Sequence, residues 1–240
     1  ALSSAASDVY KRQLSEARRG TVLNIDIGGG RTNVSVFSFG HQIVWDILNV
    51  GGDRFDDAII DYLRKKHNLL IGARTAEELK IDIGSARMRG VKLEMDACGR
   101  SLVSGLPRAV TVSSEEMIEA LDEPLRDLMS ALHRMIERTP PELAADIVDR
   151  GIVLTGGSAR LKDLDELFRR VTGMDVRVAA PEAGITEESK ERVADPACAT
   201  AVGILLKGAA SGGSSVVVDR TPAKACLLYT SPSPRDSTSS

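Results

Sequence analysis

Two glycine-rich loops, each directly after a short apolar strand, constrain this chain more than any other feature. The segment Thr21–Ile27 alternates its side chains between two faces, as a strand does, and stops at three glycines, Gly28, Gly29 and Gly30. A second strand is predicted at Gly151–Thr155, and Gly156 and Gly157 follow it. Glycines let backbone N–H groups approach phosphate oxygens. Each loop alone is also explained by an ordinary turn.

Polar residues beside these loops could complete a nucleotide site. Asp26, at the end of the first strand, could hold the hydration shell of a magnesium ion, and Ser158 adds a hydroxyl donor after the second loop. Glu77 and Lys80 share one stripe of a helix predicted over Thr75–Ala86. They could contact ribose and adenine. Without further information, an exposed salt bridge worth roughly 0.3–0.5 kcal/mol explains that pair better.

Composition excludes several other classes of protein. The formal net charge is −3, which does not indicate a nucleic-acid-binding protein. Cys98 and Cys198 are far apart and have no metal-ligand spacing, which argues against a disulfide framework or a zinc site and fits a reducing cytosol. No stretch approaches the roughly 20 apolar residues of a membrane-spanning helix.

Both ends of the chain are predicted to be non-native. Ser3–Gln13 back-translates into one strand of a transposase sequencing adapter, and Cys226–Asp236 begins with the reverse complement of the same transposon end. Residues 1–13 and 226–240 are therefore interpreted as adapter-derived tails. Residues 211–225, which include Ser-Gly-Gly-Ser-Ser, have the composition of a linker.

Local signals predict the elements between the two loops. Asp53 is expected to cap a helix after Gly51 and Gly52, and short strands are expected at Val91–Ala97 and Ser101–Val103. Ser113 and Glu116 have the spacing of a capping box. The helical stretch that they open should break or restart at Pro124.

Long motifs in this order resemble the MreB family of bacterial actin-like proteins. The matching segments are IDIGGG at 25–30, VGGDRFDDAIIDYL at 50–63, LLIGARTAEELKIDIGSA at 69–86, VSGLPR at 103–108 and ERTPPELAADIVDRGIVLTGGSARL at 137–161. The resemblance implies an α/β chain with the actin-like ATPase (ribonuclease-H-like) fold, of which only the second domain is present.

The resemblance also implies a domain organisation. Residues 14–67 and 108–180 would form the larger subdomain of that domain, with 68–107 inserted as a small α/β subdomain. Residues 181–210 would form a surface loop and a C-terminal helix that packs on the missing first domain. The first phosphate loop and the catalytic glutamate of the family would precede this sequence, so no catalytic residue is expected here and the chain should be inactive as an ATPase.

Site roles follow from the same resemblance. Asp26 would organise Mg²⁺ through water, and the second phosphate loop would consist of Gly28, Gly29 and Gly30 with Thr32. Glu77 and Lys80 would face the adenosine of ATP or ADP. Gly156 and Gly157, followed by Ser158, would form the adenosine loop.

Four positions depart from the family pattern. Arg31 and Asn33 stand where the family has a threonine and a glutamate, so a hydroxyl near the phosphates is lost and a cation is gained. Ser158 and Arg160 make the second loop look like that of heat-shock chaperone ATPases. Arg160 could lie over adenine or be an ordinary exposed arginine.

The leading functional hypothesis is a nucleotide-dependent filament protein. By resemblance it would self-associate at the inner face of the cytoplasmic membrane, hydrolyse ATP as an intact protein and guide cell-wall synthesis in rod-shaped bacteria. The alternatives are a heat-shock-chaperone-like ATPase and a sugar or metabolite kinase, both on the same fold. The match at 69–86 favours the filament protein.

Overall fold

The computed structural model describes residues 20–88, 90–181, 185 and 191–210. The predicted adapter-derived tails at 1–13 and 226–240 and the predicted linker at 211–225 lie outside the described residues, as does most of the predicted surface loop.

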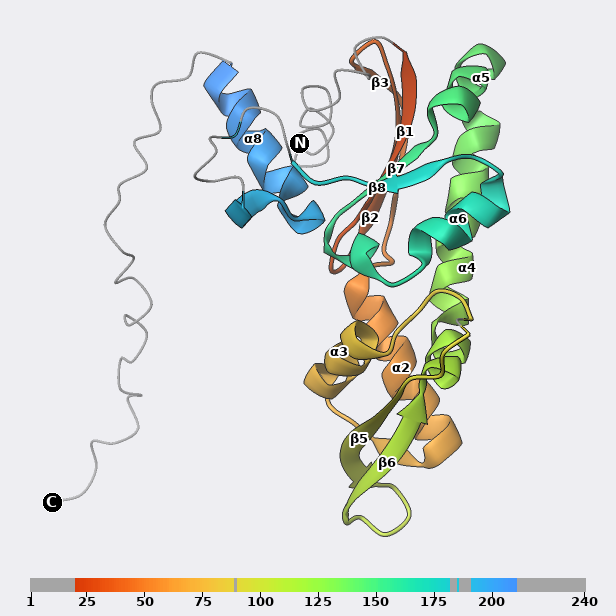
Figure 1. Ribbon diagram of the computed structural model, residues 1–240, viewed down its shortest axis with the longest axis vertical. Helices are drawn as coiled ribbons and strands as arrows, with labels where there is room; N and C mark the ends of the chain where they lie inside the picture. The colour runs from red at the N-terminus through yellow and green to blue at the C-terminus, as the bar shows by residue number, and fades with distance from the viewer. Residues whose placement is uncertain (1–19, 89, 182–184, 186–190, 211–240) are drawn as a thin grey trace, which may run out of the picture.

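A five-stranded sheet with strand order β3-β2-β1-β7-β8 lies in the upper half of the molecule as drawn in Figure 1. Its strands are β1 (Thr21–Ile27), β2 (Thr32–Ser38), β3 (His41–Leu48), β7 (Ile152–Thr155) and β8 (Val176–Val178). β1 is antiparallel to β2 and parallel to β7, and its register pairs Asp26 with Thr155. Because parallel strands end at the same edge, this pairing sends both glycine loops out of the sheet side by side.

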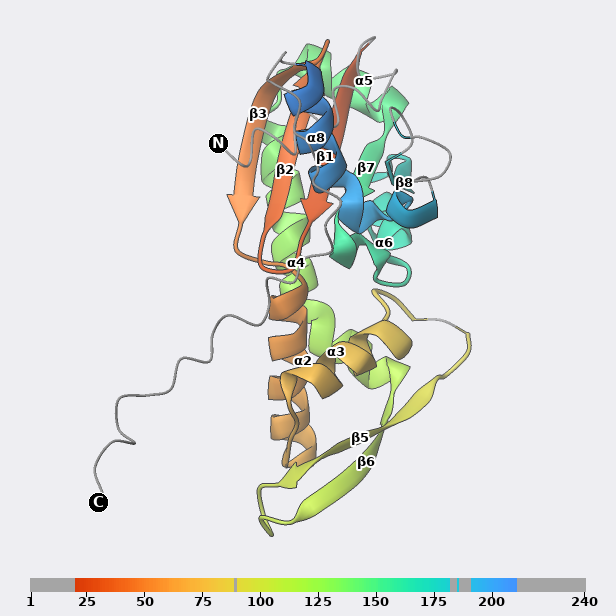
Figure 2. The same cartoon turned by 90° about the vertical axis from the view of Figure 1, so that its left-hand side faces the viewer.

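Helices lie on both faces of this sheet (Figures 1 and 2). One face is covered by α4 (Ser114–Arg138), α5 (Pro141–Arg150) and α6 (Leu164–Thr172). The last helix, α8 (Ala199–Ala210), follows the 3-10 turn η2 (Pro196–Cys198) and lies along the other face. We call the sheet with α5, α6 and α8 the large lobe.

A second, smaller sheet forms the opposite end of the molecule. It has the order β4-β5-β6, with β4 (Leu69–Leu70), β5 (Glu94–Ser101) and β6 (Pro107–Ser113). This sheet and α3 (Ala73–Asp82) make up the small lobe. The helix α2 (Gly52–His67) and the first half of α4 connect the lobes, and one continuous apolar core runs through both. The prediction of a strand at Ser101–Val103 is wrong: that segment is the end of β5 and the turn, and the returning strand is β6.

Two predictions about helices are also wrong. α4 continues through Pro124, because the buried residues on both sides of the proline, Leu121 and Leu125 among them, anchor both halves in the core and outweigh the roughly 3 kcal/mol cost of an interior proline. Asp53 does not cap α2, whose N-cap is Gly51. The capping box of Ser113 and Glu116 is confirmed.

Candidate functional site

The two glycine loops converge in the structure. The hydroxyl of Ser158, in the 3-10 turn η1 (Gly157–Arg160), donates to the carbonyl oxygen of Gly28 at 2.9 Å. Gly156 has a φ of +89°, and a Cβ there would lie 2.3 Å from the Ile27 carbonyl oxygen and 2.7 Å from Asp26 Oδ1. Only glycine therefore lets the second loop leave the sheet this close to the first.

The first loop also builds the start of α2. The N–H groups of Gly52 and Asp53 donate to the carbonyl oxygens of Gly28 and Gly29 at 3.0 and 2.8 Å. These bonds satisfy N–H groups that the first turn of a helix leaves free, and they take the place of the predicted Asp53 cap. Within the described part of the chain, the N–H groups of Gly29 and Gly30 donate to no backbone or side-chain acceptor. The loop thus keeps two donors for a ligand.

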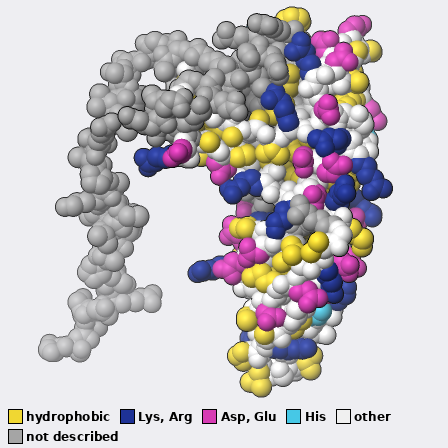
Figure 3. Space-filling model, in the orientation of Figure 1, with side chains coloured by type: hydrophobic (Ala, Val, Ile, Leu, Met, Phe, Trp, Pro, Cys, Tyr) yellow, Lys and Arg dark blue, Asp and Glu magenta, His cyan; other side chains and the backbone are white. Residues whose placement is uncertain are grey.

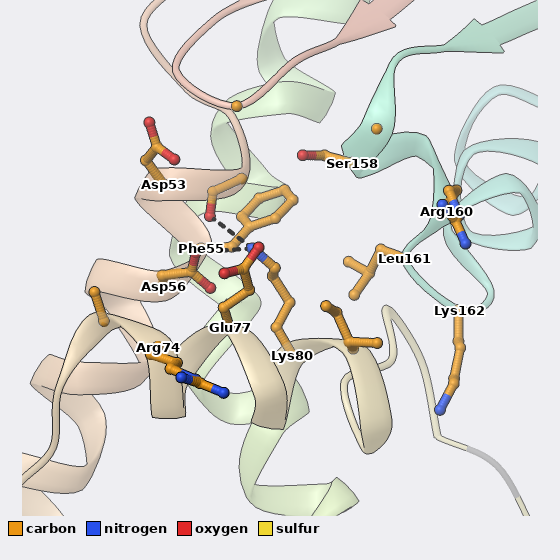
Figure 4. A pocket seen from close by; sticks show the side chains of 15 residues that line it. Asp53, Phe55, Asp56, Arg74, Glu77, Lys80, Ser158, Arg160, Leu161 and Lys162 are labelled. Carbon is orange, nitrogen blue, oxygen red and sulfur yellow. Dashed lines mark hydrogen bonds and ion pairs between the residues drawn. The ribbon is translucent and has the colours of Figure 1, made fainter. Parts of the chain in front are cut away.

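A cleft of about 790 Å³ lies between the lobes, next to these loops (Figure 4). Its volume falls in the range of small-molecule sites. Four segments line it: the first loop, the first turns of α2, one side of α3, and η1 with the residues that follow. The lining residues are Gly29, Gly52, Asp53, Phe55, Asp56, Ala73, Arg74, Glu77, Lys80, Ile81, Gly157, Ser158, Arg160, Leu161 and Lys162.

Five of the ten predicted site residues line this cleft, and five do not. Those in its wall are Gly29, Glu77, Lys80, Gly157 and Ser158, and those behind or beside it are Asp26, Gly28, Gly30, Thr32 and Gly156. Thr32 is fully buried, and its hydroxyl donates to the Val50 carbonyl oxygen at 2.7 Å. The hydroxyl of Thr32 therefore stabilises the base of the loop in this structure.

Asp26 sits at the sheet edge beneath both loops and is 8% exposed. Its Oδ2 accepts a hydrogen bond from the Thr200 hydroxyl of α8 at 3.0 Å. Burial raises the pKa of the Asp26 carboxyl, and hydrogen bonds from Thr200, Thr155 and Asn33 oppose that rise. The bond from Thr200 also ties the first turn of α8 to the end of β1, whereas Leu205, further along this helix, is 64% exposed.

Lys80 joins α3 to the start of α2. Its Nζ donates to Asp56 Oδ2 at 2.8 Å and to the Gly52 carbonyl oxygen at 3.2 Å (Figure 4). Burial raises the pKa of Asp56, and the hydrogen bond and charge of Lys80 oppose this. Arg160 lines the cleft too, but its Nη1 contacts Asp195 Oδ2 at 2.8 Å.

Asp53 and Asp56 also line the cleft, although neither was predicted as a site residue. Asp53 directly follows the pair Gly51-Gly52, and Asp56 lies one helical turn later on the same face. This spacing could have identified both as site residues. Among the residues that the structure describes, no group of three or more His, Cys, Asp or Glu side chains could hold a metal ion. No described helix is long and apolar enough to cross a membrane.

Comparison with known sequences gives one consistent result. A sequence model of the MreB/Mbl protein family matches residues 14–195. The cell shape-determining protein MreB of Escherichia coli (strain K12) is 48% identical over 155 residues, which are 65% of this chain and 45% of that protein. Mbl of Bacillus subtilis (strain 168) is 43% identical over 155 residues, or 65% of this chain and 46% of that protein. The chain spans a little under half the length of these relatives.

Solved structures agree with the sequence comparison. MreB5 of Spiroplasma citri bound to ADP superposes with a TM-score of 0.75 at 29% identity, over 86% of this chain and 59% of that one. A MamK double helical filament superposes with a TM-score of 0.55 at 17% identity, over 78% and 54% of the two chains, and shares the fold alone. The predicted actin-like ATPase fold of the α/β class is confirmed.

Proposed function

The chain belongs to the MreB/Mbl protein family, and from that premise we propose that it supplies one wall of an adenine-nucleotide site. The observation that carries the proposal is the convergence of both glycine loops and α3 on one cleft. The structures of Spiroplasma citri MreB5 with ADP and with AMPPNP support it.

The residues present fit a nucleotide. Gly29 and Gly30 offer free N–H groups to phosphate oxygens, and a Cβ at either position would meet only the Asp53 carboxylate, at 3.5–3.9 Å. Gly52 leaves the space that a side chain would take, since its Cβ would lie 2.8 Å from Ser158 Oγ. Glu77 and Lys80, on the small-lobe side, would contact the nucleoside.

A magnesium ion, when bound with the nucleotide, would neutralise phosphate charge. Asp26 would hold it through water, because Mg²⁺ usually keeps several waters and takes few protein ligands. The buried Asp26 carboxylate at the end of β1 supports this assignment. Thr32 and Gly28 would shape the phosphate loop from behind, and Gly156 and Gly157 would keep the second loop close to it.

Isothermal titration with ADP and AMPPNP tests the nucleotide proposal. We expect weak but saturable binding to the 240-residue chain, and about tenfold weaker binding for Lys80→Met, because a hydrogen bond to a charged group is lost. Lys65→Met, an exposed position on α2, is the matched control and should bind as the unsubstituted chain does. No binding at millimolar nucleotide would overturn the proposal.

We further propose that the whole protein is a cell-shape determinant that forms filaments at the inner face of the cytoplasmic membrane and organises cell-wall synthesis. Family membership supports this and favours it over the chaperone and kinase alternatives. A chimera tests it: residues 21–180 of this chain replace the matching part of E. coli MreB in cells depleted of their own copy. Retained cell shape is expected. Loss of shape despite normal chimera levels would contradict the proposal.

A further inference from the structure

Asp56 and Lys80 form a largely buried ion pair between α2 and α3. Their side chains are only 14% and 15% exposed, and the pair joins the second turn of α2 to α3. Asp56 Oδ1 is buried and has no hydrogen-bond partner among the described residues. An apolar pair of similar volume would join two helices at lower cost, because buried charges must be desolvated. Helix packing alone therefore does not explain this pair.

The hydrogen bonds of Lys80 leave one donor for a ligand. A lysine ammonium has three N–H groups, and two of them are directed to Asp56 Oδ2 and the Gly52 carbonyl oxygen. Nζ lies 3.5 Å from the position that a Cβ on Gly52 would take, at the point where α2 begins and Ser158 approaches. The third N–H is thus available at the inner end of the cleft.

The charge of Asp56 decides which ligand group suits that donor. The carboxylate of Asp56 balances the charge of the Lys80 ammonium and fixes its direction. The carboxylates of Glu77 and Asp53 add further negative charge around this pair. A phosphate gains little from a neutralised ammonium among carboxylates. A ring nitrogen or a ribose hydroxyl can accept the single N–H without bringing a second negative charge.

On the proposed nucleotide site, we propose that Asp56 is a positioning residue that aims Lys80 at the uncharged nucleoside and keeps phosphate groups out of this part of the cleft. Asp56 acts through Lys80 and does not itself contact the ligand. The phosphates are thereby directed to the free N–H groups of the first glycine loop, and the nucleoside to α3.

Parallel NMR titrations of the 240-residue chain with adenosine and with inorganic pyrophosphate test this inference. For Asp56→Asn we expect adenosine binding to weaken about tenfold, since the directed bond of a charged donor is lost. Pyrophosphate should bind several-fold more tightly, because Lys80 is no longer neutralised. Asp57→Asn, which removes the same charge from the neighbouring exposed position, should change neither affinity.

A double-mutant cycle separates positioning from a structural role. In a Lys80→Met background, Asp56→Asn should leave adenosine affinity unchanged, because the group through which Asp56 acts is gone. Equal weakening of both ligands by Asp56→Asn, or the same adenosine loss with and without Lys80, would overturn the inference. If Asp56→Asn does not fold, Asp56→Glu serves instead: it should weaken adenosine binding and leave pyrophosphate binding unchanged, and unchanged adenosine binding would overturn the inference.

The two proposals can fail separately. If the unsubstituted chain binds neither adenosine nor ADP, the nucleotide site is overturned, and the role of Asp56 with it. If it binds both and Asp56→Asn behaves like Asp57→Asn, the nucleotide site stands and only the role of Asp56 is wrong.

Discussion

The two lobes differ in how completely the central strands of their sheets, β1 and β5, are buried. All seven residues of β1 in the large lobe are buried, with helices on both faces of its sheet. In the small lobe, β5 and β6 leave many of their residues exposed. Apolar side chains gather at the tip of this lobe, where Leu102, Val103 and Leu106 are 46%, 83% and 65% exposed (Figure 3).

This difference explains which part of the candidate site each lobe provides. The large lobe provides the backbone of the two glycine loops, which the paired ends of its strands hold in place. The small lobe contributes side chains, Glu77 and Lys80, on a helix that reaches the cleft from outside the larger sheet. We therefore expect changes in the large lobe to cost stability and changes in the small lobe to alter ligand preference.

The largest loss of stability is expected where the parallel strands β1 and β7 end side by side. Gly156→Ala should lower the free energy of unfolding by more than about 3 kcal/mol, because the positive φ and the contact at 2.3 Å with the Ile27 carbonyl oxygen both penalise a Cβ. Gly173→Ala is the matched control, with a φ of +70° but open space around it, and should cost about 1 kcal/mol. Urea unfolding measures both, and equal losses would show that the close approach of the strands is not a constraint.

A smaller difference is expected between the two sheets. Ile25→Ala, in the fully buried central strand, should cost about 2–5 kcal/mol. Val110→Ala, half-buried on β6, should cost about 1 kcal/mol or less. If the substitution in the small lobe is as costly as that in the large lobe, the small sheet is as tightly packed as the large one and the two lobes do not differ in packing.

The smallest effect is expected at the capping box where β6 of the small lobe leads into α4. Burial alone would raise the pKa of Glu116, but the Ser113 N–H, His67 and Lys66 outweigh it, so the pKa lies below 4.5. Glu116→Ala should cost about 1 kcal/mol at neutral pH. The pKa of Glu116 is lower in the folded than in the unfolded chain. This stabilisation is therefore complete at pH values above the unfolded-state pKa, and it is lost as the pH falls from there through the folded-state pKa. Glu115→Ala is the control, because Glu115 lies in the same turn but outside the capping box. If the cost of Glu116→Ala does not depend on pH, the stabilising role of the Glu116 carboxylate is wrong.

Local sequence patterns predicted the large lobe better than the small one. Strict alternation before Gly28 and the glycines after β7 defined both loops, and the parallel pairing of β1 with β7 explains why they meet. The strand β6 was not predicted because it begins at Pro107 and leaves most of its residues in solvent, so its apolar pattern is weak. A break at Pro124 was predicted because the sequence does not show that tertiary packing on both sides of the proline keeps α4 continuous.

The candidate site was predictable only where backbone chemistry marked it. Glycines identified the loops, whereas only the family resemblance assigned Glu77 and Lys80 to the cleft. The bond from Lys80 to Asp56 depends on the approach of α3 to α2, which no local pattern encodes. The roles of Asp26, Thr32 and the other site residues toward a nucleotide, and the assignment of residues 181–210 to contacts with another domain, stay predictions.

Hydrogen exchange with and without ADP tests the central claim, a nucleotide site shared by both lobes, most directly. We predict that ADP slows exchange at once in three segments: the first glycine loop with the start of α2, the cleft side of α3, and η1 with the residues up to Lys162. The tip of the β5–β6 hairpin, remote from the cleft, should exchange as before. Slower exchange in the large lobe alone, with α3 unaffected, would contradict a site built between the lobes.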